Sequence, residues 1–146
     1  MRCRDGVRIT WNIVETEAYE GVHDLASHSS KGRTSRTEVM FGPAGRFYVY
    51  RIYGLHWMLN VVTGPESEAA AVLIRGVEGL DGPGRVTAAL GIDASFYGKE
   101  VRPETGLWFE SATNPRNELR ILATPRIGVA YAGPIWAPKK LRFVLA

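Results

Sequence analysis

Apolar and polar side chains alternate along the N-terminal part of the chain, from residue 7 to residue 13. The apolar positions are all odd-numbered: Val7, Ile9, Trp11 and Ile13. A period of two is typical of a strand with one buried face, so this pattern predicts a half-buried strand. The same parity continues to Glu15, Glu17 and Tyr19, which an uninterrupted strand would place on the core side.

The two glutamates cannot lie unpaired in an apolar core, because burial of an unpaired charge has a high free-energy cost. Either the core opens into a polar cleft at this point, or a β-bulge switches the parity and places both carboxylates on the surface. The residues leave the two alternatives open. Arg75 and Asn60 each interrupt an apolar run and are candidates for facing such a cleft, although a lone arginine at a strand end is more often a surface residue.

The rest of the pattern predicts further strands and one clear helix. Runs that fit strands lie at residues 46–53, 56–62, 69–77, 106–110, 126–133 and 141–146. The run at 46–53 is apolar on both faces, in the manner of a central strand. A helix is predicted at 81–92, because Pro83 suits a first helical position and Gly91 a C-terminal stop. Many strands, few helices and short turns predict a single mixed α+β domain over residues 1–146, with a largely antiparallel, curved sheet.

Composition and charge narrow the class of protein. The 146 residues carry a formal net charge of +3, and basic side chains concentrate in residues 28–53 and 114–146. Such regions attract polyanions, although a solvated basic surface explains them equally well. The single cysteine, Cys3, excludes an internal disulfide and favours a reducing compartment. No stretch predicts a membrane span or a signal peptide, so we expect a soluble, cytoplasmic protein.

Metal and serine-nucleophile chemistry find little support in the sequence. The three histidines, His23, His28 and His56, lack the spacing of metal ligands, and no Cys-x-x-Cys occurs, so no metal site is expected. No strand–turn–helix elbow surrounds the serines next to His28, which argues against a serine–histidine nucleophile.

Aromatic and basic side chains crowd one predicted strand and its end. They are Arg46, Tyr48, Tyr50, Arg51 and Tyr53. A packed core explains any one of the tyrosines. However, Tyr53-Gly54-Leu55 falls at a strand break, where Gly54 favours a tight turn. A rigid aromatic tip among arginines is suited to insertion into a stacked duplex.

An ordered set of motifs covers nearly the whole chain. The motifs are IVETEAY with ASHS, RTSRTEVMF, GRFYVYRIYGLHWMLNVV, AAVLIR, GPGRVTAALGID and RIGVAYAG. Together they resemble the alkyladenine DNA glycosylase family, the methylpurine or 3-methyladenine DNA glycosylases. The resemblance implies a monofunctional repair enzyme that acts in base excision repair. It would flip out and hydrolytically excise purines of the 3-methyladenine, 7-methylguanine, hypoxanthine or ethenoadenine type from double-stranded DNA. It also implies a monomer that needs no cofactor and is nucleoid-associated if bacterial.

The resemblance further implies roles for individual residues. Glu17 would be the general base that activates the attacking water, and Arg75 would help to hold that water, whereas Glu15 receives no catalytic role. The base pocket would be lined by Tyr19, His28, Tyr50 and Asn60. The gap left in the duplex would be filled by Tyr53 with Leu55. The DNA backbone would be contacted by Arg33, Arg36 and Arg85.

The chain departs from the family's usual pattern in four places. The usual N-terminal helix and strand are expected to be missing before Met1, and the connector at residues 76–82 is short. Ser35 stands where a proline is common, and AGPIWAPKK is slightly altered.

Two other hypotheses remain on the sequence alone. One is a carbohydrate hydrolase in which Glu15 and Glu17 form a retaining pair of carboxylates, but this leaves the Tyr53 tip without a purpose. The other is a catalytically inactive DNA-binding remnant.

Overall fold

The computed structural model describes residues 1–4, 6–111 and 120–146. The strands are β1 (Arg2–Arg4), β2 (Val7–Ile9), β3 (Ile13–Tyr19), β4 (Phe47–Ile52), β5 (His56–Thr63), β6 (Ala70–Val77), β7 (Leu80–Asp81), β8 (Ile121–Thr124) and β9 (Arg142–Leu145). The α-helices are α1 (Pro83–Leu90) and α2 (Gly133–Trp136). Short 3₁₀ helices are η1 (His28–Lys31), η2 (Glu38–Phe41), η3 (Ala94–Phe96), η4 (Pro103–Thr105) and η5 (Ala130–Ala132).

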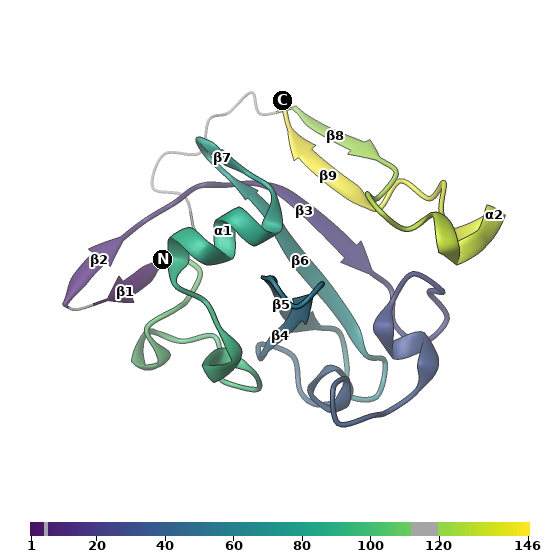
Figure 1. The fold of residues 1–146 in the computed structure, drawn as a ribbon, viewed down its shortest axis with the longest axis horizontal. Coiled ribbons are helices and arrows are strands. Elements are labelled where there is room, and N and C mark those ends of the chain that lie inside the picture. Colours follow the sequence, from purple (N-terminus) through teal and green to yellow (C-terminus); the bar gives the residue numbers. More distant parts are fainter. Residues whose placement is uncertain (5, 112–119) are drawn as a thin grey trace.

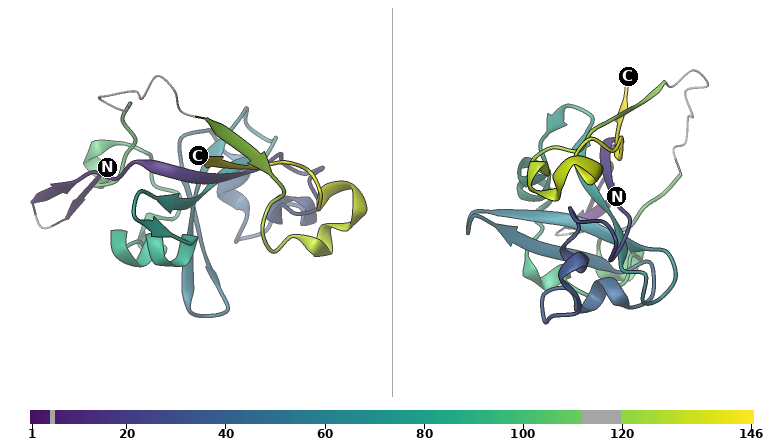
Figure 2. Two further views of the ribbon diagram at one scale, coloured as in Figure 1. Left: turned by 90° about the horizontal axis from the view of Figure 1, so that it is seen from above. Right: turned by 90° about the vertical axis from the view of Figure 1, so that its right-hand side faces the viewer.

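One curved antiparallel sheet organises the fold (Figures 1 and 2). Its strand order is β4-β5-β6-β3-β9-β8, and β7 pairs beside β6. All the strand pairings are antiparallel. The strands β1 and β2 form a separate two-stranded ribbon that extends away from the sheet in Figure 1. The predicted α+β class, with a largely antiparallel curved sheet and few helices, is confirmed.

Successive side chains of a strand point to opposite faces, and both faces of β4 are covered by other elements. One core cluster joins the sheet to α1 and includes Phe47, Val49, Leu59, Ile74, Val86 and Leu90. A second cluster joins the other face to η2 and includes Val39, Met40, Tyr48, Val62 and Ala71. The prediction that β4 is a central strand is wrong: it is the edge of the sheet. Its apolar character on both faces reflects the two covering layers instead.

The predicted helix is confirmed as α1. Pro83 occupies its first turn, where a missing N–H has no cost, and Gly91 ends it in the left-handed conformation at φ 63°. In the parts of the chain that the structure describes, no helix is both long and apolar enough to cross a bilayer.

The prediction of one half-buried strand over residues 7–13 is wrong in its continuity and its burial, although Val7–Ile9 form β2 and Ile13 begins β3. The chain breaks between β2 and β3, and Val7 and Ile9 remain 58% and 42% exposed. The alternation is real, but all three residues of β2 are exposed, so its apolar face is not buried. Periodicity shows that one face of a segment is apolar, and it does not show that another element covers that face.

Two predicted short strands are also wrong. Residues 106–110 make only isolated bridges at Leu107, and residues 126–133 form a turn followed by η5. The latter run cannot continue as a strand because Gly128 and Gly133 both have positive φ angles, 74° and 78°. The predicted strand at 141–146 is confirmed as β9.

Candidate active site

The strand β3 is irregular at Glu15. Its pairing with β6 shifts register on both sides of this residue, which lies opposite Gly76. A Cβ on Gly76 would come within 3.1 Å of the Glu15 Cβ, so a glycine here leaves room for the glutamate. Glu15 is 8% exposed and Glu17 is 0% exposed. The alternative in which a bulge places both carboxylates on the surface is therefore wrong.

Glu17 is held from three directions. Its Oε1 accepts a hydrogen bond of 2.7 Å from the backbone amide of Ile127, and its Oε2 accepts one of 3.0 Å from the Tyr19 hydroxyl. The Nη1 of Arg75, on β6, lies 3.6 Å from Oε1. The carboxylate is thus fixed in place, and the Tyr19 hydroxyl connects it to the neighbouring pocket.

Glu15 binds arginines rather than lying free. Its Oε1 accepts hydrogen bonds of 2.8 Å from Arg75 Nε and 2.5 Å from Arg142 Nε. Burial raises the pKa of Glu15, but the hydrogen bonds from Arg142 and Arg75 together lower it by more. The pKa of Glu15 therefore lies below its usual range. An ionised Glu15 therefore orients Arg75, whose Nη1 points toward Glu17.

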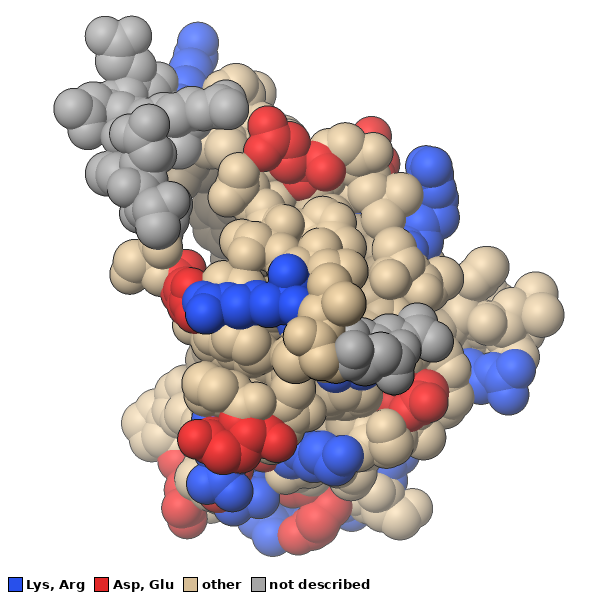
Figure 3. Space-filling model, turned by 90° about the vertical axis from the view of Figure 1, so that its left-hand side faces the viewer, with Lys and Arg blue, Asp and Glu red and all other residues tan. Residues whose placement is uncertain are grey.

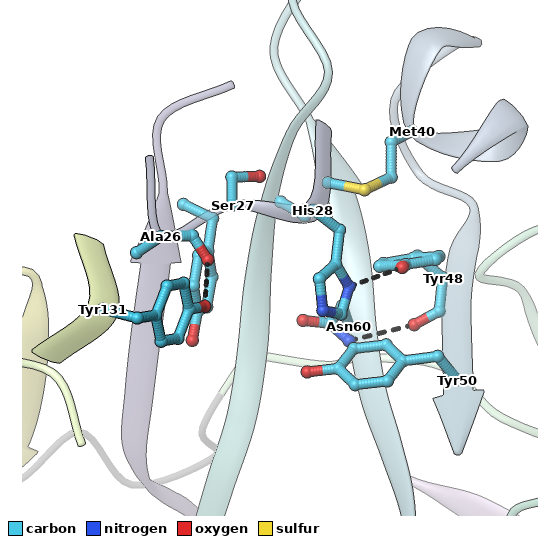
Figure 4. A pocket seen from close by; sticks show the side chains of 10 residues that line it. Ala26, Ser27, His28, Met40, Tyr48, Tyr50, Asn60 and Tyr131 are labelled. Atoms are coloured by element: carbon cyan, nitrogen blue, oxygen red, sulfur yellow. Dashed lines mark hydrogen bonds between the residues drawn. The ribbon is translucent and has the colours of Figure 1, made fainter. Parts of the chain in front are cut away.

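An open pocket of about 320 Å³, which includes solvent at its mouth, lies beside Tyr19. Its lining comes from β3–β6, the loop after β3, η1, η2 and η5: Tyr19, Ala26, Ser27, His28, Met40, Tyr48, Tyr50, Asn60, Ala71 and Tyr131. Figure 4 shows Tyr131 and Ala26 on one side and His28, Tyr48, Tyr50 and Asn60 on the other. The arrangement suits one planar ring between aromatic walls.

All four residues that the resemblance assigned to the base pocket line it: Tyr19, His28, Tyr50 and Asn60. The His28 and Tyr50 rings are 4.5 Å apart in an edge-to-face arrangement. Asn60 is 3% exposed and donates a hydrogen bond of 3.1 Å to the Tyr48 carbonyl oxygen. This bond fixes the orientation of its amide beside the cavity.

The tyrosines of the pocket stay protonated. Burial raises the pKa of Tyr19, and the charge of Glu17 raises it further. Burial also raises the pKa of Tyr50 and raises that of Tyr48 to about 12. Neutral rings keep their electron-rich faces without adding charge, which favours a cationic or electron-poor guest.

His28 is neutral at neutral pH. Burial, and to a smaller extent the charge of Arg36, lowers the pKa of His28 to about 4, and its Nδ1 lies 2.8 Å from the Tyr48 hydroxyl. Between about pH 4 and the unfolded value of about 6.5, the unfolded chain binds a proton here that the folded chain does not. The free energy of unfolding is therefore expected to rise with pH across this interval.

This pH dependence can be measured by urea unfolding between about pH 4 and pH 7. The His28→Gln variant is expected to lose part of the slope, whereas the matched control His23→Gln, at an exposed position, should keep it. An unchanged slope in His28→Gln would show that His28 titrates normally in the folded chain.

The hairpin between β4 and β5 carries the two residues assigned to DNA insertion. Tyr53 is 86% exposed and Leu55 is 72% exposed. Tyr53 has a φ of 52° and Gly54 a φ of 66°, in a turn closed by a 3.0 Å bond from Leu55 N–H to the Ile52 carbonyl oxygen. A left-handed conformation is unfavourable for a bulky residue. The hairpin thus holds an aromatic side chain outward at a cost in backbone strain.

The three arginines assigned to the DNA backbone lie in different surroundings. Arg33 forms an ion pair of 3.0 Å with Glu38, Arg36 stacks 4.9 Å above the Tyr50 ring, and Arg85 is exposed on α1. On the face shown in Figure 3, basic and acidic side chains are interspersed. Arg116, part of the second basic region, lies outside the described residues. Among these three, Arg36 is the one in contact with the pocket wall.

Several residues at the site were missed by the sequence reasoning. Tyr131 lines the pocket, Ile127 binds Glu17 through its amide, and Arg126 pairs with Asp24. These contacts join segments more than 100 positions apart, so local spacing carries no signal for them. Within the described ranges, no group of histidine, cysteine, aspartate and glutamate side chains could hold a metal ion.

The site combines a buried carboxylate, an adjacent aromatic pocket and an exposed tyrosine at the hairpin tip. The family model for methylpurine-DNA glycosylase (MPG) matches residues 1–82 and 78–146. The chain belongs to the methylpurine-DNA glycosylase family.

Similar bacterial proteins carry the name "Putative 3-methyladenine DNA glycosylase". The relative from Legionella pneumophila (strain Corby) is 45% identical over 140 residues, which cover 91% of this chain and 75% of the relative. That from Myxococcus xanthus (strain DK1622) is 47% identical over 153 residues, covering 94% and 74%. That from Anaeromyxobacter dehalogenans (strain 2CP-C) is 46% identical over 148 residues, covering 96% and 70%.

Proposed function

We propose that this chain is a monofunctional DNA glycosylase that flips a damaged purine out of duplex DNA and hydrolyses its N-glycosidic bond. Family membership supports a DNA-repair glycosylase acting on methylated purines. The finer proposal depends mainly on one observation: the fully buried Glu17 carboxylate lies between Arg75 and the Tyr19 hydroxyl, at the edge of an aromatic pocket.

Base extrusion makes use of the hairpin tip and the pocket together. Turning a nucleotide out of the stack costs a few kcal/mol, and less where damage has weakened pairing. Tyr53 would occupy the gap with Leu55. Stacking of an aromatic ring would stabilise the opened duplex by about 1–3 kcal/mol per base contacted. The extruded ring would lie between Tyr19, His28 and Tyr50, where a cationic alkylated purine gains up to about 2 kcal/mol from cation–π attraction. Asn60 would crowd the exocyclic amino group of an undamaged guanine.

The hydrolytic step needs a base and a stabilised sugar. Water would attack the sugar carbon as the bond to the base nitrogen breaks, and the electron pair of that bond would leave with the base. A cationic purine would thereby become neutral, whereas a neutral purine would also take up a proton from solvent. Glu17 would accept the proton of the water and stabilise the positive charge that develops on the sugar. Arg75, oriented by Glu15, would hold the water. The products are a free base and an abasic site in an intact strand.

The proposed partner is double-stranded DNA, contacted through Arg33, Arg36 and Arg85. The hypothesis of a carbohydrate hydrolase loses its basis, because Glu15 is bound by Arg75 and Arg142 and is not free to act as a second catalytic carboxylate. An inactive DNA-binding remnant remains an outcome of the test below.

The test is base release from a panel of duplexes that each contain one hypoxanthine, ethenoadenine or 7-methylguanine. We expect free base to appear, and strand breaks to appear only after alkali opens the abasic site. An undamaged duplex is the control. Salt-sensitive binding without release from any lesion would identify the inactive remnant, and strand cleavage before alkali would contradict the monofunctional assignment.

Tyr53→Ala provides a separate test of the hairpin tip. Loss of one base contact is expected to weaken binding of a damaged duplex by roughly 5- to 100-fold. The control is Ile121→Ala, which truncates another exposed apolar side chain, on β8, that is 65% exposed. Equal affinities of Tyr53→Ala and the wild-type chain would remove the proposed insertion.

A further inference from the structure

The carboxylate of Asp24 is fully buried in the loop that follows β3, and both of its oxygens are hydrogen-bonded twice. Arg126 Nη2 binds Oδ1 at 2.9 Å and Arg126 Nη1 binds Oδ2. The backbone amides of Ala26 and Glu20 bind the same oxygens, at 3.0 and 3.1 Å. Burial raises the pKa of Asp24, but the bonds from Arg126 and the two amides together lower it by more. The pKa therefore lies below its usual range, and the group is ionised. Asp24 therefore fixes the loop that carries Ala26, Ser27 and His28 into the pocket.

Arg126 connects this loop to β3. Besides its two bonds to Asp24, its Nη1 donates a bond of 2.9 Å to the Ala18 carbonyl oxygen. Its guanidinium stacks 4.8 Å from the centre of the Tyr19 ring, behind the pocket wall. The next residue, Ile127, donates its amide to Glu17 Oε1 at 2.7 Å. One buried arginine thus sets the position of a pocket wall and of a hydrogen-bond donor to the proposed base.

The residues that follow Arg126 also contact the loop after β3. The Tyr131 hydroxyl donates a bond of 2.9 Å to the Ala26 carbonyl oxygen, and Val129 and Ala132 pack with Ala26 in a small buried cluster. The bonds of Asp24 and Ala26 therefore join the loop after β3 to the segment at 126–132. The pocket wall formed by Ala26 and the wall formed by Tyr131 depend on this junction (Figure 4).

We propose that Asp24 and Arg126 are the positioning pair of this site. They hold the Ile127 amide on Glu17 and set the spacing of the pocket walls. The inference rests on the proposed base-excision function. Neither residue touches the substrate in this proposal, so neither is a catalytic residue.

The alternative is that the pair serves stability alone. A fully buried ion pair is a weak source of stability, because the loss of hydration offsets the attraction between the charges. Moreover, Arg126 Nε is, among the described residues, the one buried side-chain nitrogen or oxygen without a hydrogen-bond partner. The geometry is instead directed at the groups around Glu17, which a stabilising role does not require.

The test separates catalysis from binding in Asp24→Asn and in the milder Arg126→Lys, which keeps the charge but loses the two-pronged contact. We expect the single-turnover rate of base release to fall by about 10- to 100-fold, as for a misplaced reacting group. Affinity for an undamaged duplex should change by less than roughly 3-fold, since the DNA-contacting arginines are untouched. Arg8→Met, which breaks the exposed Arg8–Glu110 pair, is the matched control and should match the wild-type chain.

A second measurement does not depend on activity. Hydrogen exchange of the Ile127 amide is expected to be slow in the wild-type chain and at least about 10-fold faster in both variants, because its bond to Glu17 is loosened. Folded variants with wild-type exchange at Ile127 and a wild-type rate would overturn the proposal. If the wild-type chain releases no base from any lesion, the proposed function fails, while the exchange of Ile127 still decides whether the pair holds Glu17.

Discussion

The Glu17→Gln variant is expected to fold and to bind duplex DNA like the wild-type chain, while its single-turnover rate of base release falls by about 10²- to 10⁴-fold. Glutamine has nearly the same shape, and its amide oxygen can still accept the 2.7 Å bond from the Ile127 amide. It cannot accept a proton from water, and it carries no charge to stabilise the developing positive sugar. The measurement is release of free base under excess enzyme, with affinity for the same duplex determined separately.

Glu20→Gln is the matched control for this substitution. Glu20 lies three positions further along the chain, and its carboxylate forms an exposed ion pair of 3.1 Å with Lys139. Its loss should leave the rate of base release within about 3-fold of wild type, since exposed pairs contribute little. A Glu17→Gln variant that retains full activity would remove Glu17 as the base and, with it, the proposed hydrolytic step.

Asn60 and Arg75 could be picked out from the sequence because each interrupts an apolar run that indicates a strand, whereas the sequence left the burial of Glu17 open and its role came from the family resemblance. Glu17, Asn60 and Arg75 sit on β3, β5 and β6, which are adjacent in the sheet. The apolar runs indicate these strands, and the polar residues stand out as interruptions of them. The register that places Glu17 opposite Leu73 and so brings it near Arg75 is a long-range property of the fold.

The junction around Asp24 could not be predicted in the same way. Asp24 lies in an irregular loop, and its partner Arg126 lies in a segment that reads as a strand by alternation. The segment instead turns at Gly128 and forms η5. In this conformation Arg126, Ile127 and Tyr131 each bind a different partner. Periodicity describes elements that repeat one environment, and a segment with a different partner at each residue has no period to detect.

The Gly21→Ala variant is expected to lose about 2–5 kcal/mol of unfolding free energy, the sum of a left-handed backbone penalty and overpacking. Gly21 has a φ of 95°, and an added Cβ would lie 2.1 Å from the Glu68 carbonyl oxygen. The turn that carries Glu68 cannot easily retreat, because Ser67 and Ala69 already have positive φ angles and Ala69 is fully buried. The loop that starts at Gly21 leads to Asp24 and His28, so its displacement should also reduce base release.

Gly79→Ala is the control that separates strain from collision. Gly79 also has a positive φ, 77°, but an added Cβ there meets no atom within 4 Å. Its variant should lose only about 1–2 kcal/mol and keep the wild-type rate of base release. Urea unfolding gives both free energies, and hydrogen exchange of the Ala26 amide reports whether its bond to Asp24 persists in Gly21→Ala. Equal losses in the two variants would mean that the loop after β3 moves away from Glu68 at little cost, and that the position of His28 does not depend on this contact.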